Sequence, residues 1–245
     1  MPVTAVKALL FAAGRGERMR PRSDTTAKPL LRAGGRRLIE WQIEALVRAG
    51  VREIVINTAH LAQQIEDTLG DGGRYGTRLR YSREGSSAEG ALETLGGIVE
   101  ALPLLGAAPF IAASSDIVTD FDYGRLAGPL AAIARGTADA HLVLVDNPPF
   151  HSDGDMGLVG GRVRMQRPHL TYGNIGIFSP GLFDGVGHGR ARLFPWLYRF
   201  VEQGRVSGEH FRGRWHNIGT PAELDALDAE LSDSGPPEST VPPAA

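Results

Sequence analysis

Short apolar runs alternate with amphipathic segments along residues 7–148. The runs are bounded by Gly, Pro or Asp and lie at 7–13, 51–59, 77–82, 109–116 and 140–148. Between them, apolar side chains recur at the three- and four-residue spacing of a helix, at 38–50, 61–70, 91–106 and 123–136. Because strands that alternate with helices build open sheets, the pattern predicts a Rossmann-like α/β fold. Its sheet is expected to be mixed and mostly parallel, with helices on both faces.

The pattern changes after Asp146. It then predicts a hairpin at 156–166, a strand at 169–178, a helix at 191–204, a strand and loop at 210–220, and a last helix at 221–231. Gly160 and Gly161 suit the turn of the hairpin, and Pro195 is tolerated because it falls near the first turn of its helix. Thr220 is the expected N-cap of the last helix.

The chain of 245 residues is long enough to bury one sizeable hydrophobic core. We expect a single domain over residues 1–231, made of two halves at 6–146 and 147–231. The remaining segment at 232–245 is rich in Pro and Ser, a composition that predicts a disordered tail.

Composition and charge exclude several functional classes of protein and several kinds of site. A net charge of −2, with 22% charged residues of both signs, provides no electrostatic footprint for nucleic acid or for an anionic membrane surface. The absence of cysteine excludes disulfides, thiolate metal sites and a cysteine nucleophile. Neither a signal peptide nor an apolar stretch of membrane-spanning length is evident. We therefore expect a cytoplasmic protein without nucleic-acid or membrane partners, and the oligomeric state stays open.

The most informative stretch, AAGRGERMRPRSDTTAKPLL, follows the first predicted strand. Gly14 and Gly16 fall at the carboxyl edge of the predicted sheet, where open α/β sheets bind ligands. Ala12 and Ala13 are small enough for a ligand to approach the backbone, and successive amides of a glycine-rich turn can bind an anion. The stretch therefore predicts a phosphate site.

Three kinds of nucleotide site are consistent with glycines at this place, and the sequence separates them. A dinucleotide-binding fingerprint fits badly, because Met19 replaces its third glycine, Pro21 prevents an immediate helix, and the second strand ends in Asn57 rather than an acid. A Walker A loop is excluded because no Gly-Lys-Ser/Thr follows. The third interpretation is an extended loop around a nucleoside triphosphate, with Arg18 and Lys28 directed at the phosphates.

This stretch closely resembles the signature of the sugar-1-phosphate nucleotidylyltransferases, which runs as small-Ala-Gly-x-Gly-x-Arg-Met/Leu-x-Pro, a Thr-containing stretch and Lys-Pro. The resemblance extends through most of residues 6–230. The segments EIVINTAHLAQQIEDTLGDG and HLVLVDNP are most similar to the branch that uses UTP and N-acetylmuramate 1-phosphate. The resemblance implies a fold of the nucleotide-diphospho-sugar transferase type, with a nucleotide-binding half at 6–146 and a sugar-binding half at 147–231.

The implied reaction is attack of a sugar 1-phosphate oxygen on the α-phosphorus of UTP or another nucleoside triphosphate, with Mg²⁺ as cofactor and pyrophosphate as the second product. Such transfers depend on positioning and on positive charge opposite the phosphate oxygens. The resemblance assigns this catalytic charge to Arg18 and Lys28. It assigns nucleotide binding to Ala12, Ala13, Gly14, Gly16 and Glu17.

The resemblance also implies a Mg²⁺ site. Asp116 ends the fourth predicted strand and corresponds to the metal-binding carboxylate of the family, although an Asp that caps the next helix is an equally good interpretation of the residue alone. Ser115 stands where the family has glycine. Asn217, in RWHNIGTPAEL, stands where a second metal-ligating Asp is common.

Further residues are expected to contact the base and the sugar. Glu84 and Gly85 lie in the base-reading region, where a carboxylate suits uracil, and a solvated loop acid is the alternative. The expected sugar-binding residues are Glu93, Thr94, Asp146 and Asn174. For Asp146 a simple turn is the alternative role.

Two other functions stay open at this point. Another nucleotide-sugar pyrophosphorylase, acting on glucose or mannose 1-phosphate with UTP, dTTP or GTP, would use the same scaffold. A catalytically degenerate module that only binds nucleotide sugars is favoured by Ser115 and Asn217. The presence of both Arg18 and Lys28 argues against that module, because binding of base and sugar alone does not need two phosphate-directed cations.

Overall fold

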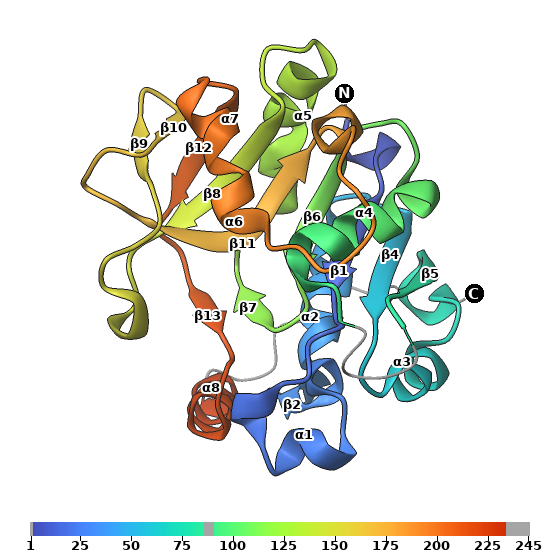
Figure 1. Ribbon diagram of the computed structural model, residues 1–245. Coiled ribbons are helices and arrows are strands. Elements are labelled where there is room, and N and C mark those ends of the chain that lie inside the picture. Colours follow the sequence, from blue (N-terminus) through green and yellow to red (C-terminus); the bar gives the residue numbers. More distant parts are fainter. Residues whose placement is uncertain (1, 86–90, 234–245) are drawn as a thin grey trace.

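The computed structural model describes residues 2–85 and 91–233. A nine-stranded sheet runs through this part of the chain (Figure 1). In sheet order its strands are β5 (Arg78–Arg83), β4 (Glu53–Thr58), β1 (Ala8–Phe11), β6 (Phe110–Ser114), β11 (Thr171–Phe178), β8 (Ala140–Val145), β12 (Val206–Phe211), β10 (Arg162–Arg164) and β9 (Gly157–Val159).

The sheet is mixed, as the sequence predicts. Strands β5, β4, β1 and β6 are parallel to one another, β11 runs antiparallel to both β6 and β8, and β12 is parallel to β8. The register pairs Phe11 with Asn57 on one side and with Ser114 on the other. The carboxyl ends of β4, β1 and β6 therefore meet at one edge of the sheet, where the predicted loop begins.

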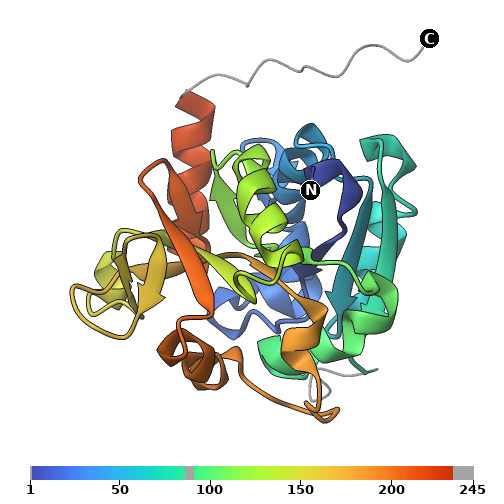
Figure 2. The ribbon, with the colours of Figure 1, turned by 90° about the horizontal axis from the view of Figure 1, so that it is seen from above.

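Helices cover both faces of the sheet (Figure 2). One face packs against α2 (Leu38–Arg48), α3 (Ala62–Leu69) and α5 (Ala127–Ala134). The opposite face packs against α4 (Glu93–Leu105), α6 (Leu193–Trp196) and α7 (Tyr198–Glu202). Because side chains alternate along a strand, Leu10 of β1 enters the first core and Leu9 enters the second.

A third, smaller core lies below the sheet edge, between α8 (Pro221–Asp233) and the loop after β1. Here the hairpin of β2 (Arg32–Ala33) and β3 (Arg36–Arg37) lies beside α8 (Figure 1). Met19, which replaces the third glycine of a dinucleotide fingerprint, is fully buried in this core with Leu224 and Leu227. The loop is thus fixed by apolar packing as well as by its backbone turns.

Most predicted elements are present. The predicted hairpin turns at Gly160 and Gly161. Helix α8 begins with a capping box at the predicted N-cap, Thr220. The Glu223 carboxylate accepts from the Thr220 amide at 2.8 Å, and the Thr220 hydroxyl accepts from the Glu223 amide at 3.3 Å. The helix predicted at 191–204 is divided into α6 and α7, and Phe194 has extended backbone angles. Helix α8 continues to Asp233, two residues into the predicted tail, and 234–245 lie outside the described residues.

Among the described residues, no helix is both long enough and apolar enough to cross a bilayer.

Candidate active site

A cavity of about 880 Å³ opens at the carboxyl edge of β1, β4 and β6. We call it the main cavity. Its wall is formed by the loop after β1, the ends of β4 and β6, the start of α4 and two single residues from later segments, Arg190 and Gly219. The structure brings most of the predicted site residues to it: Ala12, Ala13, Gly14, Gly16, Glu17, Arg18, Lys28, Glu84, Glu93, Thr94 and Asp116.

The glycine-rich loop is shaped by Gly16. Its φ is +63°, a left-handed conformation that glycine adopts without strain. The Gly16 carbonyl accepts from the Met19 amide at 2.8 Å and from the Ser23 hydroxyl at 2.7 Å. A Cβ at position 16 would lie 3.1 Å from the Lys28 Cβ. The absence of a side chain therefore lets Lys28 pass close beneath the loop.

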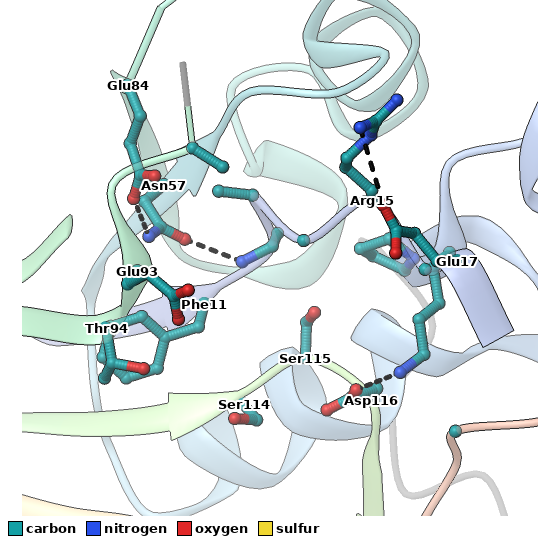
Figure 3. Close-up of a pocket in the computed structure, with 18 of the residues that line it drawn as sticks. Phe11, Arg15, Glu17, Asn57, Glu84, Glu93, Thr94, Ser114, Ser115 and Asp116 are labelled. Atoms are coloured by element: carbon teal, nitrogen blue, oxygen red, sulfur yellow. Dashed lines mark hydrogen bonds and ion pairs between the residues drawn. The ribbon is translucent and has the colours of Figure 1, made fainter. Parts of the chain in front are cut away.

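Lys28 and Asp116 face each other across the main cavity floor. The Lys28 ammonium donates to Asp116 Oδ2, and both side chains are largely shielded from solvent. Figure 3 shows Asp116 and Ser115 directed toward the loop after β1. The residue after Asp116 begins β7 (Ile117–Thr119), and Asp122 caps the next helical turn instead. Asp116 is therefore not a helix cap, and that alternative is wrong.

Arg18 lies against the segment that precedes α8. A Cβ at Gly219 would be 2.9 Å from Arg18 Nη2, so the glycine leaves room for the guanidinium. Within residues 2–85 and 91–233, Arg18 has no acidic or hydrogen-bonding partner, whereas Arg15 pairs with Glu17 at 3.5 Å. The Arg18 donors are thus available to an anion in the main cavity.

A buried hydrogen-bond network connects the loop to α4, and we call it the Glu84 network. The Ala12 amide donates to Asn57 Oδ1 at 2.7 Å, and the Asn57 amide group donates to Glu84 Oε1 (Figure 3). The Leu92 amide donates to Glu84 Oε2 at 2.8 Å. Burial raises the pKa of Glu84 above its usual range, although the hydrogen bonds from Leu92 and Asn57 oppose that shift. Both carboxylate oxygens of Glu84 therefore already accept hydrogen bonds from the protein. Contact between Glu84 and the base of the nucleotide stays a prediction.

The start of α4 supplies Glu93 and Thr94 to the main cavity (Figure 3). Glu93 has a φ of +61°, which is rare for a residue with a side chain. Its carboxylate lies 3.0 Å from Arg190 Nη2 and 3.6 Å from Arg192 Nε. Strained residues of this kind cluster at ligand sites.

The remaining predicted residues lie outside the main cavity. Gly85 is exposed and does not line it. Asp146 follows β8 with its side chain 75% exposed, accepts from His210 Nε2 at 2.9 Å, and reaches neither this cavity nor the next. Asn174 and Asn217 line a second cavity of about 210 Å³.

The second cavity has amide and aromatic walls. Asn174 has a φ of +55° and lies in a bulge of β11, where the pairing with β8 shifts register, so that its side chain is redirected. Asn217 and Trp215 belong to β13 (Trp215–Asn217), which pairs with β7 directly after Asp116. Within the described ranges, no three acidic or histidine side chains are grouped to hold a metal.

A family model described as nucleotidyl transferase matches residues 7–151. A protein from Neisseria meningitidis serogroup B, named N-acetylmuramate alpha-1-phosphate uridylyltransferase, is 46% identical over 231 residues, which cover 91% of this chain and 97% of that protein. The chain belongs to the sugar-1-phosphate nucleotidylyltransferase family. A protein of the same name from Caulobacter vibrioides is 30% identical and covers 93% of this chain, with 97% of its own length matched.

Solved structures confirm the nucleotidylyltransferase fold. A putative glucose-1-phosphate thymidylyltransferase from Bacillus anthracis superposes with a TM-score of 0.79 at 16% identity, and the match covers 94% of this chain and 96% of that one. Asn57 and Arg190 are among the residues of this nucleotidylyltransferase's main cavity that were not predicted as site residues from the sequence. The sequence placed Asn57 at the end of a predicted strand but gave it no role in the site, and no local motif marks Arg190.

Proposed function

We propose that this nucleotidylyltransferase joins UTP to N-acetylmuramate 1-phosphate, giving UDP-N-acetylmuramate and pyrophosphate. The observation that carries the proposal is the 46% identity, over nearly the whole of both chains, to a protein named for that activity. The main cavity supports it, because its glycine-rich loop and two cations suit a triphosphate.

In the proposed reaction, an oxygen of the sugar 1-phosphate attacks the α-phosphorus of UTP. A new oxygen–phosphorus bond forms, and the bond from the α-phosphorus to the oxygen bridging the β-phosphate breaks. Pyrophosphate leaves with the electron pair. Arg18 and Lys28 hold positive charge opposite the phosphate oxygens that gain negative charge, while the backbone around Gly14 and Gly16 positions the triphosphate.

The donor set at Asp116 fits Mg²⁺. This ion takes one or two protein carboxylates together with phosphate oxygens and waters, and Asp116 presents one carboxylate to the main cavity where the triphosphate is proposed to bind. Asp116 would hold the ion, with Asn217 as the proposed second ligand from the neighbouring strand. Bound Mg²⁺ would neutralise and align phosphate oxygens.

The second cavity is proposed to take part of the sugar. Amide groups such as that of Asn174 both donate and accept hydrogen bonds, which suits hydroxyl and acetamido groups. Trp215 adds an apolar surface in the same wall. Glu93 and Thr94 would contact the sugar from the main cavity.

The proposal is tested by pyrophosphate release from the full chain with Mg²⁺. Each of UTP, dTTP, GTP, CTP and ATP is paired with the 1-phosphates of N-acetylmuramate, N-acetylglucosamine, glucose and mannose, and the nucleotide sugar is identified by mass. We expect the highest kcat/KM with UTP and N-acetylmuramate 1-phosphate. A higher value for another pair would refute the substrate assignment. Binding of UTP without release from any pair would instead favour a degenerate binding module.

A further inference from the structure

Arg190 differs in origin from the other cations of the main cavity. Arg15, Arg18 and Lys28 all come from the single loop after β1. Arg190 comes from segment 184–192, which connects to α6 and crosses the start of α4 (Figure 1). The main cavity therefore has positive charge on two separate walls. One is the loop after β1, which we call the phosphate loop, and the other is the segment that carries Arg190.

The backbone on both sides of Arg190 is fixed to α4. The Ala191 carbonyl accepts from the amides of Leu95 and Gly96 at 3.0 and 3.2 Å. A Cβ at Gly96 would lie only 2.2 Å from the Gly189 carbonyl oxygen, so the segment rests directly on the helix. Arg190 is thus held at a defined place on the cavity wall although its side chain is 70% exposed.

Glu93 leaves much of the Arg190 guanidinium available. The carboxylate of Glu93 is shared between Arg190 and Arg192, so that the three side chains together carry a charge of about +1. Because these ion pairs are solvated, each contributes little stability by itself. A guanidinium has five N–H donors in a planar fork, and the contact to Glu93 uses one end of it.

We propose that Arg190 binds the carboxylate of the sugar substrate and thereby selects N-acetylmuramate 1-phosphate over neutral sugar phosphates. The inference rests on the proposed function. N-acetylmuramate differs from N-acetylglucosamine by a lactyl ether that ends in a carboxylate, so its 1-phosphate carries an anion away from the anomeric phosphate. A guanidinium matches a carboxylate with two parallel hydrogen bonds, and this pairing also gives orientation.

Other cations near the two cavities are less suited to that carboxylate. Arg18 and Lys28 lie on the loop after β1, where both are proposed to face the phosphates of the nucleotide. His151 lines the second cavity, but it already contacts Asp155 at 3.0 Å and it carries charge only when protonated. Arg190 is permanently charged and comes from a different segment from the cations of the loop after β1.

The test compares two sugar phosphates that differ only in the lactyl group, N-acetylmuramate 1-phosphate and N-acetylglucosamine 1-phosphate. For the native chain and each variant, kcat/KM is measured at saturating UTP, and the dissociation constant is measured by calorimetry with a non-hydrolysable UTP analogue. Arg190→Gln is the main variant. Arg192→Gln is the matched control, since Arg192 also contacts Glu93 but does not line the main cavity.

We expect Arg190→Gln to lower the preference for the muramate by about 10- to 100-fold, the effect of one hydrogen-bonded charge pair. Arg192→Gln should leave the preference within about threefold. Arg190→Lys should restore part of it, because the charge remains and the fork is lost. A recovery by Lys also separates recognition of charge from a general effect on folding.

An equal loss for both sugar phosphates in Arg190→Gln would overturn the proposal, because it would place Arg190 on the phosphate they share. An equal change in Arg192→Gln, or a larger change in His151→Gln, would overturn it as well. A native chain that turns over neither substrate would refute the proposed function. In that event the ratio of the two dissociation constants in the native chain and in Arg190→Gln still decides the role of Arg190.

Discussion

Replacement of Gly97 by alanine tests whether the Glu84 network holds the main cavity together. Gly97 lies inside α4, where alanine ordinarily stabilises a helix by about 1 kcal/mol relative to glycine. In this helix an added Cβ would lie 2.3 Å from Glu84 Oε1 and 2.7 Å from Asn57 Nδ2. Because both neighbours are buried, the methyl group must separate the amide from the carboxylate.

The expected cost follows from the bonds that are lost. A buried polar group that loses its partner costs about 1–3 kcal/mol. The hydrogen bond between Asn57 and Glu84 is directly displaced, and the bond from the Leu92 amide is strained with it. Two buried groups, the Asn57 amide and the Glu84 carboxylate, lose each other as partners. After the helix gain of about 1 kcal/mol is subtracted from their combined cost, we expect Gly97→Ala to lower the free energy of unfolding by about 1–5 kcal/mol.

The assay is urea unfolding of the native chain and the variant, together with their affinity for UTP. Gly128→Ala is the matched control, because Gly128 lies in α5 and a Cβ added there would meet no neighbouring atom within 4 Å. It should be neutral or stabilising by up to about 1 kcal/mol. If Gly97→Ala is as stable as Gly128→Ala and binds UTP normally, the Glu84 network does not hold the cavity.

Three further predictions concern the charged and amide groups. Lys28→Met should reduce kcat by about 10²- to 10³-fold without unfolding the chain. The control Arg20→Met, at an exposed residue outside the main cavity, should leave kcat unchanged. Asn217→Asp should lower the Mg²⁺ concentration for half-maximal activity, because a carboxylate adds charge to the proposed site, and superimposable titrations would contradict this. Burial opposes ionisation of Glu209, but the close approach of His141 at 3.5 Å and the hydrogen bonds from Arg125 outweigh that effect and lower the pKa of Glu209. The stability advantage of the native chain over Glu209→Gln should therefore be full at pH 7 and decline as the pH falls through that lowered pKa, as urea unfolding at pH 7, 5 and 3.5 would show.

Most strands of the main sheet could be predicted because they are long enough for their apolar pattern to be recognised. The three-residue strands β9 and β10 could be predicted because Gly160 and Gly161 mark the turn between them. The short strands β2, β3 and β7 have two or three residues each, and no periodicity is detectable over that length. The division of the predicted helix at Phe194 could not be predicted from the local sequence either, because Pro195 is compatible with the start of a helix as well as with an interruption.

The site was predictable where its residues lie in one stretch of chain. Gly16, Lys28 and the residues between them form such a stretch, and Asp116 ends a recognisable strand. Arg190 reaches the cavity only because segment 184–192 rests on α4, which is a tertiary contact between distant parts of the sequence. The sequence marks Asn57 only as a missing acid, and its actual contacts to Ala12 and Glu84 come from strand register.

The Glu84 network joins the two walls of the main cavity, and this has consequences for substrate selection. At one end it holds the amide of Ala12, where the phosphate loop begins, and at the other it holds the amide of Leu92, beside the segment that carries Arg190. A change in the network should therefore displace both walls. Gly97→Ala should lower kcat/KM for the muramate and the glucosamine substrates to a similar extent, whereas Arg190→Gln should separate the two. A network variant that altered the preference alone would show that the walls are not coupled.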